Sequence, residues 1–147
     1  MDLVKQFREY TRQLECHLEN MNSVGDCCCS VNKTQCFLIV EIGREPGISV
    51  KELADILRID KSGVSRFVED LVRKGFVERK PSAEDRRFVM LDLLPKGQER
   101  FEKIERDMYD RFKEVLEQIP EDKQEQVVEA LKIYNEACLM VEDKDND

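Results

Sequence analysis

The sequence predicts a mainly α-helical fold with a small β-wing, and three observations support this. Apolar residues recur at steps of three and four over several long stretches, which is the spacing of one face of an amphipathic helix. Between these stretches, two short runs rich in valine, leucine and phenylalanine flank a polar segment, as in a β-hairpin. The chain has 147 residues with 41% hydrophobic and 38% charged side chains, a composition that excludes collagen-like and low-complexity classes.

The first helix is predicted over 3–21, where apolar side chains form a single stripe. A second helix begins after Asn32, because Asn32 and Gln35 have the spacing of a capping box, and it runs to about Arg44. In such a box each side chain accepts a hydrogen bond from the other residue's backbone N–H, so the first turn of the helix is stabilised at both positions.

A pair of short helices follows. Ser49 and Glu52 form the stronger capping box and begin the first of them, which is short and apolar on one side. Asp60 then caps a helix over 61–74, and Gly75 ends it as a C-terminal cap. The tight turn between the two helices is typical of a helix-turn-helix.

Two strands are predicted directly after this pair, over 76–80 and 87–93, and the polar segment 81–86 separates them. The segment and the residues beside it carry several basic side chains, so the hairpin has a basic tip.

Two long helices complete the chain. The first begins at Pro95, a residue well suited to the first helical position, and Pro120 ends it. The last helix carries an apolar stripe that includes Cys138, which we interpret as a small buried apolar side chain. Residues 142–147 are expected to form a flexible tail. No stretch resembles a linker, so residues 1–147 are predicted to form a single domain.

The charge is unevenly distributed. The net charge is −8, which by itself argues against a nucleic-acid partner. Residues 101–147, however, hold 7 Lys and Arg against 15 Asp and Glu, whereas residues 44–100 hold 13 against 11. The central segment therefore has the local excess of cations that a phosphate backbone requires.

A helix-turn-helix followed at once by a two-stranded wing presents a helix to the major groove of DNA and a basic loop to a neighbouring minor groove. On the predicted helix over 61–74, polar positions alternate with buried ones, so one face is free to read DNA, and Arg66 suits a bidentate guanine or phosphate contact. Asp85 is expected to orient a neighbouring guanidinium. The simpler alternative is an ordinary packed helix pair with charges facing solvent. The candidate DNA-binding residues are Lys61, Ser62, Ser65, Arg66, Arg73, Arg86 and Arg87.

Four motifs resemble the MarR family of winged helix-turn-helix transcriptional regulators: DKSGVSR at 60–66, LVRKGFVER at 71–79, EDRR at 84–87 and LLPKG at 93–97. The resemblance covers nearly the whole chain. It implies a winged helix-turn-helix domain plus a helical dimerisation region, with dimerisation helices at 1–22 and 95–141 and the DNA-binding part at 34–93. It also implies a homodimer on a pseudo-palindromic double-stranded operator, with repression as the commoner outcome.

Two positions depart from the family pattern. Gly63 stands where the family usually has a hydroxyl residue, and Leu94 stands where a threonine usually caps the fifth helix. The homodimer also has a physical argument of its own, because the terminal apolar stripes are too long for the small central part to cover. A two-fold dimer places its two recognition helices roughly 34 Å apart, as successive major grooves require.

The cysteines suggest a sensor. The run Cys27, Cys28 and Cys29 lies in the segment between the first two helices, with Cys36 and Cys16 near it in sequence. Two of the three adjacent thiolates with Cys36 would suit a soft metal or metalloid ion such as Cu(I) or trivalent arsenic. Zinc would need a fourth ligand from Cys16, His17, Glu41 or the other subunit. Oxidation to a disulfide is an equal alternative, and a small lipophilic or phenolic effector remains open.

Other classes fit less well. The chain has a single histidine and no nucleophile–base set or phosphate-binding loop, so it is not expected to be an enzyme, and no cofactor is certain. A metal-binding interaction protein that does not bind DNA is the remaining alternative. No apolar run approaches the roughly 20 residues of a membrane helix and no export signal begins the chain, so we expect a cytoplasmic protein without a membrane partner.

Overall fold

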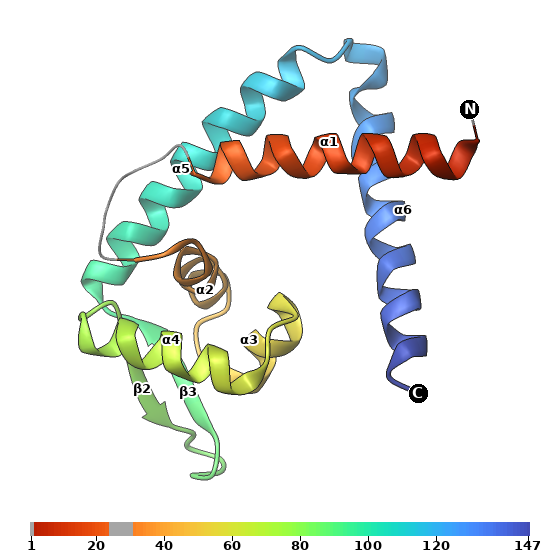
Figure 1. Cartoon of the computed structure of the whole chain (residues 1–147). Coiled ribbons are helices and arrows are strands. Elements are labelled where there is room, and N and C mark those ends of the chain that lie inside the picture. Colours follow the sequence, from red (N-terminus) through yellow and green to blue (C-terminus); the bar gives the residue numbers. More distant parts are fainter. Residues whose placement is uncertain (1, 24–30) are drawn as a thin grey trace. The chain divides into compact units, whose positions relative to one another are not determined.

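The computed structural model describes residues 2–23 and 31–147 (Figure 1). Over these residues the chain divides into two compact units, one ending at Met108 and the other spanning Tyr109–Asp147. No helix in the described ranges is both long enough and apolar enough to cross a membrane. The elements, in order, are α1 (Leu3–Ser23), α2 (Lys33–Arg44), β1 (Ile48–Ser49), α3 (Val50–Leu57), α4 (Lys61–Arg73), β2 (Val77–Pro81), β3 (Val89–Leu93), α5 (Pro95–Glu117) and α6 (Glu121–Asp145).

The predicted helix starts agree closely with the structure. At α2 both bonds of the capping box form: the Gln35 N–H donates to Asn32 Oδ1 at 2.8 Å and the Asn32 N–H to Gln35 Oε1 at 3.0 Å. At α3 only half of the predicted box forms. Ser49 Oγ accepts the Glu52 N–H at 3.1 Å, but the Glu52 carboxylate accepts the Ser49 hydroxyl, also at 3.1 Å, in place of a backbone amide.

Helix α4 ends in a Schellman motif at the predicted glycine. Gly75 has a φ of +84°, in the left-handed region that favours glycine. Its N–H donates to the Val72 carbonyl at 3.1 Å, and the Phe76 N–H donates to the Leu71 carbonyl at 2.9 Å. The chain thereby reverses from α4 directly into β2.

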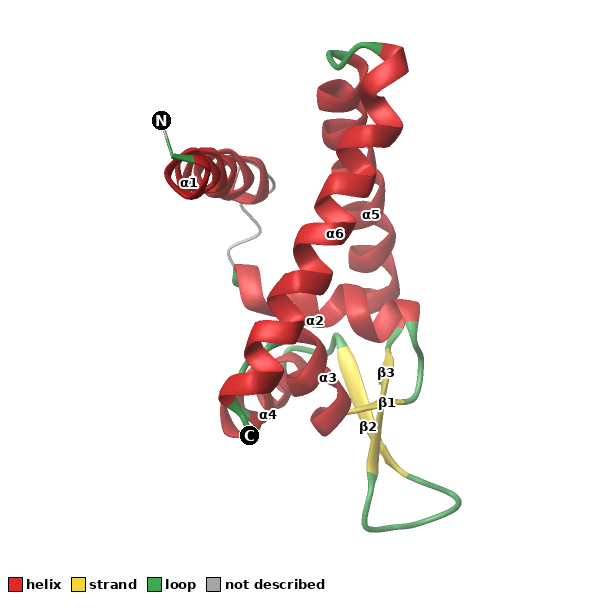
Figure 2. Ribbon diagram, turned by 90° about the vertical axis from the view of Figure 1, so that its right-hand side faces the viewer, coloured by secondary structure: helices red, strands yellow, loops and turns green. Residues whose placement is uncertain are grey.

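The sheet has three antiparallel strands in the order β1-β3-β2. The predicted hairpin is confirmed within two residues at each strand start, with Val77 opposite Leu93 and Pro81 opposite Val89. The third strand, β1, was not predicted: Ile48 pairs with Leu91. Figure 2 shows the hairpin extending away from the helices of the first unit and ending in a loop, which we call the wing loop (82–88).

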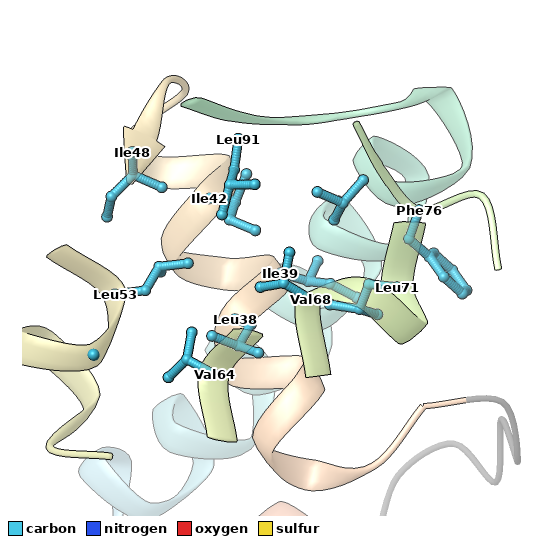
Figure 3. Close-up of a cluster of buried hydrophobic side chains, with 12 residues drawn as sticks. Leu38, Ile39, Ile42, Ile48, Leu53, Val64, Val68, Leu71, Phe76 and Leu91 are labelled. Atoms are coloured by element: carbon cyan, nitrogen blue, oxygen red, sulfur yellow. The ribbon is translucent and has the colours of Figure 1, made fainter. Parts of the chain in front are cut away.

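The core of the first unit lies between α2, α3, α4 and the sheet (Figure 3). Helix α4 contributes the apolar face that the sequence pattern predicted, and its Phe67 and Val72 pack at the edge of the core. In α3 the prediction holds for Leu53 but not for Ile56, which is 47% exposed. Because the apolar side of α4 is fixed in this core, its opposite side must face solvent. The core side chains include Leu38, Ile39, Ile42, Ile48, Leu53, Val64, Val68, Leu71, Phe76 and Leu91.

The second unit is built differently. It contains the end of α5 and all of α6, and none of its residues is buried. Helix α6 continues to Asp145, whereas the sequence led us to expect a flexible tail over 142–147.

Candidate nucleic-acid interface

The polar face of α4 is open to solvent along its whole length. Lys61, Ser62, Arg66 and Arg73 are exposed and Ser65 is half-buried, while the same helix buries Val64, Val68 and Leu71 completely. We call α4 the candidate recognition helix. Its fixed apolar side and exposed polar side together present a row of donors and cations on a rigid element.

The N-terminus of α4 is organised by Asp60. Its carboxylate accepts the Gly63 N–H at 2.9 Å and the Ser62 hydroxyl. These donors, first the hydroxyl and then the amide, hold the pKa of Asp60 below its usual value, so the cap is ionised at neutral pH. Ser62 therefore presents its oxygen, an acceptor, to any incoming group.

The local structure explains why a glycine stands at position 63. A Cβ at this position would lie 3.0 Å from Asp60 Oδ1, closer than ordinary van der Waals contact. A side chain with a hydroxyl, the usual family residue here, would require the Asp60 cap to move. The departure from the family pattern thus accompanies a tight N-cap.

The wing loop is organised by a second aspartate. Asp85 Oδ1 accepts the Arg87 backbone N–H at 3.0 Å, and Oδ2 forms an ion pair with the Arg87 guanidinium at 2.9 Å. This pairing lowers the pKa of Asp85 and raises that of Arg87. Backbone bonds from Ser82 N–H to the Phe88 carbonyl, at 2.9 Å, and from Phe88 N–H to the Asp85 carbonyl, at 3.0 Å, close the loop.

The cations of the interface fall into two groups. Arg87 is held by Asp85, and Arg73 pairs with Asp70 at 2.6 Å. In contrast, Lys61, Arg66 and Arg86 are exposed and form no ion pair with any residue in the described part of the chain. The unpaired group needs to break no existing ion pair to reach a phosphate or a base edge.

A cluster around Asp70 was not predicted from the sequence. The Asp70 carboxylate accepts Lys74 Nζ at 2.7 Å, Gln35 Nε2 at 2.7 Å and the Arg73 guanidinium, and these donors in that order hold its pKa far below the usual value. Gln35 is only 2% exposed and also donates to the Phe67 carbonyl at 3.3 Å. Gln35, which completes the capping box of α2, therefore also bonds α4. Only its role in the capping box could be predicted from the sequence.

Only part of the predicted cysteine site lies within the residues that the structure describes. Cys27, Cys28 and Cys29 lie outside the described residues. Cys16 is exposed on α1, and Cys36 is half-buried on α2, next to Gln35. Within residues 2–23 and 31–147, no group of three or more His, Cys, Asp or Glu side chains is arranged to hold a metal ion.

The chain is similar in sequence to known proteins. The MarR family model matches residues 30–87, which includes α2, the helix-turn-helix and most of the wing. The HTH-type transcriptional regulator BilQ of Clostridium symbiosum (strain WAL-14163) is 33% identical over 96 residues, covering 65% of this chain and 67% of that protein.

Solved structures agree on the fold. A crystal structure of Streptococcus pneumoniae FabT in complex with DNA superposes with a TM-score of 0.77 at 22% identity, covering 95% of this chain and 98% of that one. A MarR protein from Peptoclostridium difficile gives 0.78 at 21% identity, covering 88% and 86%. The chain therefore belongs to the MarR family, whose members are DNA-binding transcriptional regulators and not enzymes.

Proposed function

We propose that the chain is a repressor that binds a pseudo-palindromic operator as a homodimer, with α4 in the major groove and the wing loop at the adjacent minor groove or phosphates. The observation that carries this proposal is α4 itself. Three of its apolar side chains are completely buried in one core, while Lys61 and Arg66 are exposed on its other side and form no ion pair with a described residue. An immobilised helix that presents unpaired cations suits a groove of DNA.

The DNA contacts divide by role. We propose that Arg66 and Ser65 contact bases or phosphates in the major groove, and that Ser62 accepts a hydrogen bond from a base there. Lys61 and Arg73 contact the backbone. On the wing, Arg86 enters the minor groove, Arg87 follows it, and Asp85 holds Arg87 in place. Because we propose a DNA operator as the partner, we also propose that the protein acts in the cytoplasm.

The homodimer is supported by the apolar surface that a single chain leaves uncovered. On α1, Phe7 is 55% exposed and Tyr10 68%. In the second unit, Phe112 is 44% exposed and Val115 51%, with Val128 of α6 at 57%. Soluble monomers rarely leave so many large apolar side chains in solvent, and a second copy of the same helices would cover them.

The DNA assignment is tested by selection of binding sites. Purified protein is incubated with random duplexes, and the enriched sequence is used to measure affinity by fluorescence anisotropy. We expect Arg66→Ala and Arg86→Ala each to weaken binding about tenfold or more. Lys123→Ala, which removes an exposed cation from α6, is the matched control and should bind like the wild type. Equal affinity of Arg66→Ala and wild type would refute the placement of α4.

The homodimer is tested by sedimentation. The wild type should sediment with close to twice the 17.3 kDa of one chain, whereas Val115→Asp should shift the equilibrium toward the single chain, because it places a charge among apolar side chains. A wild type that stays monomeric at micromolar concentration would contradict the proposal.

We further propose that thiol chemistry at the cysteine segment controls operator binding, either through a soft metal or metalloid ion or through oxidation. Cys36 supports this, because it neighbours Gln35, whose side chain bonds α4. Operator release is measured with the wild type and with the triple variant Cys28→Ser, Cys29→Ser and Cys36→Ser, under peroxide, arsenite, Cu(I) and Zn(II). Release that is identical in both proteins would locate the sensor elsewhere and favour a small organic effector.

A further inference from the structure

The C-terminal end of α4 is joined to the first turns of α5 by a set of contacts that we call the α4–α5 junction (Lys74, Phe76, Leu94, Lys96 and Gly97). Lys96 Nζ donates to the Lys74 carbonyl at 2.9 Å. The same ammonium lies 4.3 Å from the centroid of the Phe76 ring. The Leu94 N–H donates to the Phe76 carbonyl at 2.9 Å. All five residues belong to the first unit.

Lys96 acts on α4 in two ways. The carbonyls at the end of a helix lack intrahelical partners and carry its negative dipole end, so a cation that bonds one of them is favourably placed. The ammonium also faces the ring of Phe76, which is 1% exposed and belongs to the core. One side chain of α5 therefore binds both the carbonyl of Lys74, the C-cap residue of α4, and Phe76, the residue that leads into β2.

Gly97 sets the distance between the two elements. A Cβ at this position would lie 2.1 Å from the Phe76 carbonyl oxygen and 3.2 Å from Leu93 Cδ2. The first of these atoms belongs to the backbone, so an added methyl group would force the backbones apart. The junction thus combines a close backbone contact that only glycine allows with a charged bond beside it.

The other face of the α4 end is held as well. Asp70, one turn before the Lys74 carbonyl, bonds Gln35 of α2. The end of α4 is thereby fastened to α2 on one side and to α5 on the other, and its direction relative to α5 is determined by bonded contacts on both sides.

We propose that Lys96 and Gly97 are positioning residues, which fix the angle between the candidate recognition helix and α5 and thereby set the half-site spacing that the dimer accepts. The inference rests on the proposed function. In a dimer held together by α5 and its neighbours, the separation of the two α4 helices depends on how α4 is fixed to α5. Lys96 itself does not contact DNA in this account.

The angle is measured without DNA. Residual dipolar couplings of backbone amides in α4 and in residues 95–108 are collected for the wild type, Lys96→Met, Lys96→Arg and Gly97→Ala. We expect one alignment tensor to fit both helices in the wild type and in Lys96→Arg. Lys96→Met and Gly97→Ala should need separate tensors, although alanine favours the α5 helix itself. One tensor for all four proteins would overturn the proposal, whether or not the chain binds DNA.

The consequence is measured on DNA. Affinities are compared for the selected operator, for operators with one base pair inserted or removed between half-sites, and for a single half-site. The wild type should discriminate against altered spacing by about tenfold and Lys96→Met by about twofold, with half-site affinity unchanged. Uniform weakening of all duplexes by Lys96→Met would instead make Lys96 a phosphate contact and refute the positioning role. Lys123→Met, with the same loss of charge, should behave like the wild type.

Discussion

Replacing Gln35 by alanine tests the link between α2 and α4. The side chain makes three hydrogen bonds, with the Asn32 N–H, the Phe67 carbonyl and the Asp70 carboxylate, and it is 2% exposed. Each bond contributes on the order of 1 kcal/mol, so the substitution should lower the free energy of unfolding by about 3 kcal/mol. For a chain of this size the corresponding fall in Tm is about 10 °C.

The assay is guanidinium denaturation followed by far-UV circular dichroism, at one fixed protein concentration because a dimer's stability depends on concentration. The matched control is Gln98→Ala. Its side chain makes one exposed bond to Glu102, at 3.3 Å, so its effect should stay within about 0.5 kcal/mol. A Gln35→Ala protein as stable as the Gln98→Ala protein would refute the view that this glutamine joins the two helices.

Three further predictions concern single charged residues. Asp85→Asn should weaken operator binding several-fold in an anisotropy titration, although it removes a negative charge near DNA, because Asp85 holds Arg87 in place. The neighbouring Glu84→Gln should leave the affinity unchanged. Stronger binding by Asp85→Asn would contradict the wing geometry. The pKa of Asp70 is lowered in the folded state by the Lys74 ammonium and further donors, so its stabilising effect is present above the unfolded pKa of about 4 and is lost as pH falls. The stability difference between wild type and Asp70→Asn should therefore shrink in denaturation curves from about pH 7 to about pH 3, and a constant difference would count against this reasoning. Arg58 ends α3 with a φ of 56°, in the left-handed region that favours glycine. Arg58→Gly should therefore raise the free energy of unfolding by up to about 1 kcal/mol. A loss of stability in thermal denaturation would show that the contacts of the arginine side chain outweigh the backbone strain.

Local patterns in the sequence were sufficient for most elements of the first unit. The caps at Asn32, Asp60 and Gly75 act through bonds that close within one turn, so residue types three or four positions apart reveal them. The buried face of α4 was predicted for the same reason, because helical periodicity is itself local.

Contacts between distant residues were not visible. Strand β1 has two residues and exists because Ile48 pairs with Leu91, and nothing beside Ile48 announces this partner. The bond from Gln35 to Asp70 and the bond from Lys96 to the Lys74 carbonyl likewise join residues far apart in the chain. These two bonds hold the C-terminal end of α4, and residue types alone do not specify them.

The site was predicted as a set of residues but not as two electrostatic groups. The sequence placed Arg66, Arg73, Arg86 and Arg87 on the same surface and predicted that Asp85 orients a neighbouring guanidinium. It did not indicate that Arg73 is paired with Asp70. The structure separates the unpaired Arg66 and Arg86 from Arg87, which Asp85 holds, and from Arg73, which Asp70 holds. This division predicts different roles: the unpaired arginines contribute new phosphate or base contacts, and the paired ones arrive in a fixed geometry.

The salt dependence of operator affinity tests the central claim most directly, because contacts to phosphates release counterions in proportion to their number. Affinity is measured over a series of salt concentrations for the wild type, Arg86→Ala and Lys123→Ala. We expect a steep linear fall of log affinity with log salt for the wild type, a slope shallower by about one unit in Arg86→Ala, and an unchanged slope in Lys123→Ala. A flat wild-type response would show that phosphate contacts do not carry the binding, and identical slopes in all three proteins would show that the wing loop is not part of the DNA-binding surface.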